Sequence, residues 1–416
     1  MKRHGLITAA VLLIFVSAAG VFPARAQDTL MIAFTANTNG QLLDCGCGGE
    51  IAGGLPRRGW EFAQLRKAFP QSIFLDGGDF LATVERELQN AVAVEAYRLL
   101  DYDAVGLGEQ EFWNGRRFWV RKVLGAKLPF LCANLILPDS LRTRVRPAVV
   151  LTRGTFHLRV IGLLSPQTFL YFDSERKPAL RLQPPAAALE RELERAKESE
   201  LIAVIYHGDE KDVATLRKRF PRVLLWFVAH QEGEMPHGWS RVRTPAVVFS
   251  SQDGSSIELL KLTGPPEKPA VFARRFWLTK DLPRDKRLLH LVENYYQDLR
   301  ENLTGKRQPD GTYRGSAACR HCHLLTYESW QKTAHAGSLK AVAGRSGNCN
   351  KCHAPAGGTH PVDCEACHAV SARHGEWDFT DRKAVAGAKK CRRCHTRKWS
   401  PRFEFQAYWR KIAHSR

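Results

Sequence analysis

Four copies of one pattern, Cys-x-x-Cys-His, stand in the last quarter of this 416-residue chain and begin at Cys319, Cys349, Cys364 and Cys391. The pattern is the attachment signal of c-type haem, because two thiols three residues apart reach both vinyl groups of one porphyrin and the adjacent histidine ligates the iron. Four haems in so short a segment would form its core, so it would fold only with haem bound. The sequence therefore predicts a mainly helical, haem-packed domain.

Each copy supplies two cysteines and one proximal histidine. The predicted attachment residues are Cys319, Cys322, Cys349, Cys352, Cys364, Cys367, Cys391 and Cys394, and the predicted proximal ligands are His323, His353, His368 and His395. One such pattern can also be half of a zinc site. Four copies, each with the histidine in the same place, favour four covalently bound haems.

The first two thirds of the chain alternate between two kinds of segment. Apolar runs that end in turn residues are typical of strands buried on both faces. They cover Leu30–Thr35, Ser72–Asp79, Leu201–Gly208 and Arg222–His230, and stretches with helical spacing lie between them. This alternation predicts an α/β layered sandwich.

The composition changes near Gly305, where strand-like runs end and cysteine, histidine and basic residues dominate. Residues 283–303 have the spacing of one amphipathic helix. We therefore expect a signal peptide over residues 1–26, an α/β domain over 27–265, a linker with this helix over 266–312 and a tetrahaem domain over 313–416.

The N-terminus has a basic start, an apolar run and Ala-Arg-Ala before Gln27. This is the layout of a secretory signal peptide. The alternative is a membrane anchor, but the run is short for a full span and Pro23 interrupts its end. We expect a periplasmic or extracellular protein.

The net charge of +20 is large. A basic surface can bind nucleic acid or anionic membranes. No nucleic-acid fold signature accompanies the charge, and haem propionates would neutralise part of it. We therefore expect acidic redox partner proteins, self-assembly through the haem domains, and no nucleic acid.

The C-terminal segment resembles the tetrahaem cytochromes of the hydroxylamine-oxidation electron-acceptor type. The resemblance rests on CRHCH followed by a Trp and a His, on CEACHAVSARH, and on CRRCH followed by a Phe-rich stretch and a final His. It implies that His335, His374 and His414 are distal haem ligands, although Ala369-Val370-Ser371 replaces the family's Gly-Pro-Gly. His360 is the local candidate for the remaining haem and His290 is another. The resemblance also implies that one haem can stay five-coordinate and bind a small molecule such as nitric oxide.

Residues 29–265 resemble the catalytic domain of 5′-nucleotidases and related dinuclear metallophosphoesterases, including the thiosulfate-processing hydrolase of sulfur oxidation. The motifs that carry this resemblance are FTANTNG, LDGGDFL, YDAVGLGEQEFWNG, IYHGDE and VAHQE, in the family's order. The family holds two metals with Asp, His and Asn. The resemblance implies that Asp79, His207 and His230 are retained, while the residues that replace family ligands or catalytic groups are Asn37, Asn39, Glu109, Gln110, Trp113 and Glu232.

Two interpretations of this domain stay open. In one, it is a degenerate scaffold for docking or assembly. In the other, a rearranged site holds one divalent metal through Asp79, Glu109, His207, His230 and Glu232, which are suitable ligand types. No catalytic residue is assigned.

The loop DCGCGG contains Cys45 and Cys47, which are too close to cross-link easily to each other. One of them pairs with another cysteine, or both are ordinary thiols in a glycine-rich turn. The other interpretation is a thiol or persulfide site near the position of the family's catalytic pocket.

The sequence as a whole predicts an exported tetrahaem c-type cytochrome for electron transfer, with a degenerate phosphoesterase-like domain as scaffold or docking module. One alternative is a redox-linked, metal-dependent hydrolase of phosphate or sulfur esters at a remodelled site. Another is a nitrogen oxide reductase at one five-coordinate haem. Whether the chain is an enzyme is left open, and electron carriage is favoured over hydrolysis.

Overall fold

The structure is a computed structural model. It describes residues 29–44, 50–83, 86–172, 180–303, 315–342, 347–355, 361–368 and 387–414. The predicted signal peptide, the thiols Cys45 and Cys47, and the distal-ligand candidates His360 and His374 lie outside the described residues.

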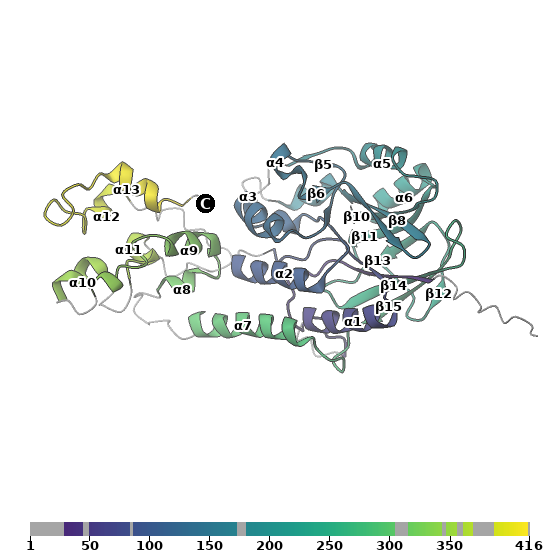
Figure 1. Ribbon diagram of the computed structural model, residues 1–416, viewed down its shortest axis with the longest axis horizontal. Coiled ribbons are helices and arrows are strands. Elements are labelled where there is room, and N and C mark those ends of the chain that lie inside the picture. Colours follow the sequence, from purple (N-terminus) through teal and green to yellow (C-terminus); the bar gives the residue numbers. More distant parts are fainter. Residues whose placement is uncertain are drawn as a thin grey trace, which may run out of the picture.

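Two β-sheets form the centre of the first part of the chain (Figure 1). The eight-stranded sheet has the order β12-β15-β14-β1-β2-β3-β4-β6, and the five-stranded sheet has the order β13-β11-β10-β8-β7. The strands are β1 Thr29–Thr35, β2 Ile73–Asp76, β3 Ala104–Gly106, β4 Phe130–Leu131, β5 Leu135–Ile136, β6 Val145–Arg146, β7 Ala148–Arg153, β8 Phe156–Leu164, β9 Arg181–Leu182, β10 Leu201–Gly208, β11 Val223–His230, β12 Ser240–Arg241, β13 Ala246–Phe249, β14 Ser256–Thr263 and β15 Ala270–Trp277.

Helices of the first domain pack on the outer faces of both sheets, and further short helices form the C-terminal segment. They are α1 Leu55–Ala68, α2 Glu87–Leu100, α3 Gly115–Phe118, α4 Asp139–Arg142, α5 Pro185–Glu194, α6 Glu210–Arg219, α7 Lys286–Leu303, α8 Ser316–Cys319, α9 Leu324–Gln331, α10 Gly347–His353, α11 Cys364–Cys367, α12 Ala388–Cys391 and α13 Phe405–Ile412, with short 3-10 or π turns at Gln110–Phe112, Trp119–Val123, Leu124–Ala126, Pro166–Tyr171 and Lys340–Val342.

Alternation along β1 separates the layers, because successive side chains of a strand point to opposite faces. Ile32 and Phe34 face the core between the sheets, where Phe34 meets Phe227 of β11 at a ring distance of 4.8 Å. Ala33 faces the core under the helices, with Phe62 of α1 and Tyr97 of α2. The predicted α/β sandwich is thereby confirmed.

The sheet continues beyond residue 265, where the expected domain boundary falls. Strand β15 pairs antiparallel with β14 along its whole length. The helix expected as a linker, α7, contributes buried Leu288, Val292 and Tyr295 to the core under the helices. It therefore belongs to the packing of the first domain.

Several strands of the two sheets run parallel within their own sheet. In one sheet β1, β2 and β3 are parallel neighbours, and in the other β8, β10, β11 and β13 are. The carboxyl ends of parallel strands meet at one edge, which is where open α/β sheets bind ligands. A ligand site is therefore expected at the loops after β1, β2 and β3 and at the ends of β10 and β11.

The C-terminal segment consists, in its described part, of the short helices α8 to α13, gathered beyond the ends of α2 and α7 (Figure 1). Its second helix, α9, is docked on the first domain. The Leu325 side chain is buried in the core under the helices, and the Leu325 backbone N–H donates to Glu87 of α2 at 2.9 Å. Glu328 forms an ion pair with Lys122 at 2.6 Å. The haem-packed core that the sequence predicts here stays a prediction.

Within the described ranges, every helix is too short or too polar to span a lipid bilayer.

Candidate metal centre

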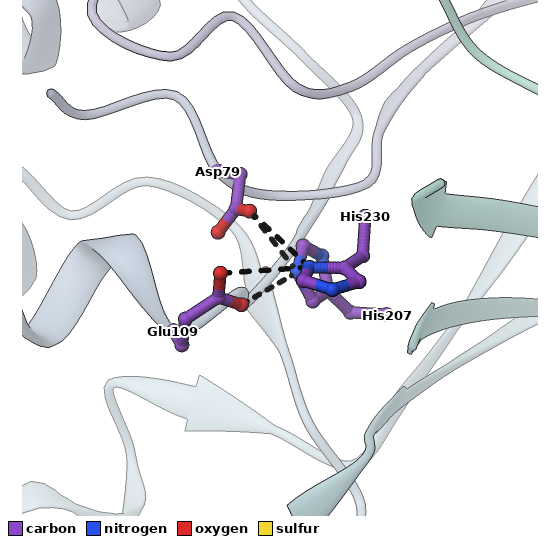
Figure 2. A group of neighbouring side chains, drawn as sticks. All are labelled: Asp79, Glu109, His207 and His230. Atoms are coloured by element: carbon purple, nitrogen blue, oxygen red, sulfur yellow. Dashed lines mark hydrogen bonds and ion pairs between the residues drawn. The ribbon is translucent and has the colours of Figure 1, made fainter. Parts of the chain in front are cut away.

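Four side chains converge at the carboxyl edge of the two sheets. Asp79 follows β2, Glu109 follows β3, and His207 and His230 lie at the ends of β10 and β11. Each offers one ligand atom, and these four atoms lie within 4.8 Å of one another. Figure 2 shows both imidazoles turned toward the two carboxylates. Each sheet thus provides half of a donor set that suits one divalent transition metal.

The hydrogen bonds of His207 decide its tautomer. Its Nδ1 lies 2.9 Å from the carbonyl oxygen of Gly77, which can only accept, so Nδ1 carries the hydrogen. Its Nε2 then faces Glu109 Oε2 at 2.9 Å and Asp79 Oδ2 at 3.3 Å. A neutral imidazole would turn a lone pair toward negative oxygens, which is favourable only if a cation lies between them. This orientation is typical of a metal-ligating histidine with a backbone partner.

The electrostatics of the four groups point the same way. Burial lowers the pKa of His207, but the charges of Asp79 and Glu109 outweigh it and raise the pKa well above the ordinary value. Hydrogen bonds to Asp79 and Glu109 raise the pKa of His230 to about 9. Burial opposes ionisation of Asp79, yet His207 and His230 hold its pKa below the usual range. The centre therefore attracts positive charge, which a proton or a metal ion supplies.

Unusual backbone conformations concentrate at this edge. Four non-glycine residues around the centre have positive φ: Asn37 at 50°, Asn39 at 52°, Asp79 at 56° and His230 at 77°. Such conformations are uncommon, and strained backbone clusters at functional sites. This concentration of strained backbone supports the assignment of this edge as a functional site.

Glu111 stabilises the loops of the centre through backbone hydrogen bonds, a role that the sequence did not predict. Its buried carboxylate accepts backbone hydrogen bonds from Asp79 at 3.1 Å, Phe80 at 2.9 Å and Gly108 at 2.7 Å. Burial and the nearby charge of Asp79 raise its pKa to about 8. A Cβ at Gly108 would collide with the Asp79 carboxylate and the His207 ring. The only sequence signal for these roles is the Gly-Glu-Gln-Glu run itself.

Glu232, the fifth predicted ligand, does not join the centre. The chain leaves β11 at His230, and Glu232 is exposed in the loop that follows. Its role as a ligand stays a prediction, since its exposed side chain lies outside the group of four. Trp113 packs its ring against Phe172 at 5.0 Å.

The predicted haem ligands that the structure describes form two cross-segment pairs. His335 and His395 have ring centroids 6.2 Å apart, and His368 and His414 have ring centroids 5.7 Å apart. Each pair joins one predicted proximal ligand with one predicted distal ligand. His290, the other candidate, lies on α7 and interacts with Asn294 at 3.0 Å.

The predicted attachment cysteines also approach across motifs. A hydrogen bond with the Cys319 side chain, followed by burial, raises the pKa of the Cys364 thiol. Burial and the neighbouring Cys352 raise the pKa of Cys394 to about 11. The first motif therefore lies beside the third, and the second beside the fourth.

Comparison with known proteins supports the resemblance of the first domain to 5′-nucleotidases. No protein-family model matches the chain. Mouse 5′-nucleotidase is 29% identical over 176 residues, which are 40% of this chain and 30% of that protein. The match thus spans about a third of that relative's length.

Solved structures show the same fold. A 5′-nucleotidase precursor from Thermus thermophilus superposes with a TM-score of 0.57 at 20% identity, over 66% of this chain and 60% of that chain. The sulfate thiohydrolase SoxB of the same organism superposes with a TM-score of 0.56 at 14% identity, over 66% and 61%. About two thirds of the chain therefore has a metallophosphoesterase-like sandwich, and its N-terminal domain is 5′-nucleotidase-like.

These findings overturn the leading functional prediction. The expectation of an electron-transfer cytochrome with a degenerate scaffold is wrong, because four of the five predicted metal ligands converge in a buried centre of this fold. The sequence relative is a 5′-nucleotidase, and the fold is that of a solved 5′-nucleotidase precursor. The hydrolase alternative is the better supported one.

Proposed function

We propose that the protein is a metal-dependent hydrolase of phosphate or sulfur esters, with its centre at Asp79, Glu109, His207 and His230. The observation that carries the proposal is the convergence of these four ligands within 4.8 Å. Its place at the carboxyl edge of a 5′-nucleotidase-like fold supports it further.

The ion would supply a polarised ester oxygen and a water of lowered pKa. The chain's residues do the rest. Asp79 and Glu109 would provide the negative charge to hold the ion, and the Gly77 carbonyl orients His207. Glu111 ties the loops after β2 and β3 together, so the two carboxylates stand in place before an ion arrives. Such preorganisation in a buried site strengthens every charge interaction.

The substrate class follows from the kinds of relative that share the fold. Nucleotidases act on phosphate esters, and a sulfate thiohydrolase acts on a sulfur analogue, so both handle a tetrahedral oxyanion group. We propose that this chain does the same and that export places it in the periplasm or beyond.

The test is turnover by the purified full chain loaded with Mn²⁺ or Zn²⁺. We expect phosphate release from nucleoside monophosphates or nitrophenyl phosphate, or sulfate release from thiosulfate. Chelation is expected to stop the reaction and metal to restore it. Loaded protein that turns over none of these substrates would contradict the proposal.

We also propose that residues 313–416 carry four c-type haems and make the hydrolase redox-linked. The four Cys-x-x-Cys-His copies support this. So do the pairs His335–His395 and His368–His414, each of which brings a predicted proximal ligand close to a predicted distal ligand. Export, which the sequence predicts, would bring the chain to an acidic redox partner.

A haem count tests this part separately. We expect four covalent haems per chain in the pyridine haemochrome spectrum of protein made in a host that matures c-type cytochromes. Replacing both Cys364 and Cys367 with serine is expected to leave three. Cys132→Ser is the matched control, since this buried cysteine lies outside the motifs. A chain without covalent haem would refute the haem proposal and leave the hydrolase untouched.

A further inference from the structure

A network of side-chain amides borders the metal centre. Gln110 donates its backbone N–H to Asp79 Oδ1 at 3.1 Å and its side-chain Nε2 to Asn39 Oδ1 at 3.0 Å. Asn39 in turn donates to Gln252 Oε1 and to Asp253 Oδ1, both at 3.0 Å. The amides therefore bond to one another on the side of Asp79 where the loop after β1 lies.

Asn37 closes the same side. Its Oδ1 accepts the backbone N–H of His230 at 2.8 Å, and its Nδ2 is the remaining donor. The side chain is 1% exposed, and Nδ2 has no hydrogen-bond partner. The buried Oε1 of Gln110 also has none. An unpaired buried polar group is unfavourable unless a ligand or a water satisfies it.

These groups suit a neutral ligand and not a metal ion. An amide carries no charge and is a poor ligand for divalent transition metals. An N–H donor cannot ligate a cation, and one of the two lone pairs on each of the Asn37 and Asn39 side-chain oxygens already accepts a hydrogen bond. An acceptor would satisfy the unpaired Nδ2 of Asn37, and an O–H donor would satisfy the unpaired Oε1 of Gln110.

The charge of the centre leads to the same conclusion. Asp79 and Glu109 supply two negative charges, which match one divalent ion. Glu111 is occupied by three backbone donors. Asp253 and Glu232 are exposed. A second ion in this buried place would bring two further positive charges, and buried charge without compensation is unfavourable.

We propose that the centre binds one divalent ion, where the family that the sequence resembles uses two. Asn37 and the amides of Asn39 and Gln110 hold a neutral group, a water or a substrate hydroxyl, beside it. The inference rests on the proposed hydrolase function and adds the stoichiometry of its centre and the nature of the neighbouring subsite.

Metal counting on the full chain tests this inference. The apo protein is dialysed against Mn²⁺, and Mn and Fe are measured separately by mass spectrometry, with EPR to tell an isolated Mn²⁺ from a spin-coupled pair. We expect one Mn per chain and the spectrum of an isolated ion. Two ions, or a coupled pair, would overturn the inference. No bound Mn would overturn the proposed function itself, so the two failures are distinguishable.

A double variant tests whether the asparagines decide the count. Asn37→Asp with Asn39→His adds a carboxylate and an imidazole, and both residue types tolerate the left-handed backbone found there. We expect the count to rise to two. The control, glycine at both positions, suits the same backbone but adds no ligand and should stay at one. A correctly folded double variant that still binds one ion would refute the role of the asparagines. If the double variant does not fold, the metal count of the wild type still tests the inference.

Discussion

Replacing His207 with alanine is expected to abolish metal binding and to lower kcat/KM for the preferred ester by about 10³-fold or more. His207 faces both carboxylates through Nε2 and is fully enclosed, so no other donor can take its place. A metal supplies several kcal/mol of transition-state stabilisation, and each 1.4 kcal/mol is a factor of ten in rate. Metal content and steady-state kinetics on the same sample provide the measurement.

The loss should also show in stability. A ligand at 100 times its Kd stabilises a folded protein by about 2.7 kcal/mol. We therefore expect added Mn²⁺ to raise the Tm of the wild type and not that of the variant. Asp79→Asn removes a charge without leaving a cavity and should behave alike. His157→Ala is the matched control, because His157 is exposed on β8 and remote in sequence from the ligands. A His207→Ala protein that keeps wild-type turnover would disprove the centre.

The second large effect is expected from Glu111→Ala, which should destabilise the first domain by about 3 kcal/mol or more. The change leaves the buried backbone N–H groups of Asp79, Phe80 and Gly108 without their acceptor. Each orphaned donor costs about 1–3 kcal/mol. Denaturant unfolding followed by tryptophan fluorescence measures the change.

The Glu111→Ala variant should also bind metal more weakly, because Glu111 joins the two loops that carry Asp79 and Glu109. Glu190→Ala is the control, since this carboxylate is exposed and pairs only at the surface with Arg219 at 3.0 Å. Exposed ion pairs contribute about 0–1 kcal/mol. Equal stability of the Glu111 and Glu190 variants would show that the three hydrogen bonds do not support the centre.

Strands and helices of the first domain were largely predictable from the sequence. Runs such as Leu201–Gly208 coincide with β10, because a strand buried on both faces is a continuous apolar run. Three retained family residues and Glu109 pointed to the metal centre. The functional prediction is wrong because it compares each residue separately with the ligand at the same position of a family. A metal needs only enough donors in one place, and Glu109 supplies a carboxylate there.

The amide network was not predictable. Asn39 meets Gln252, which lies 213 residues further along the chain, through a side-chain hydrogen bond. Nothing local marks either residue as a partner of the other. The exposure of Glu232 was hidden for a similar reason, since the direction of a loop after a strand depends on what packs around it.

The sequence alone determined what depends on local order: the buried strands, the helical spacing, and the Cys-x-x-Cys-His copies whose spacing matches one porphyrin. Only the tertiary structure decided which side chains meet. It brought two carboxylates from one sheet to two imidazoles from the other, set His335 beside His395, and left Glu232 in solvent. The physical reason is that ligation and charge depend on distances of a few Å, which are set by the packing of sheets and loops far apart in the chain.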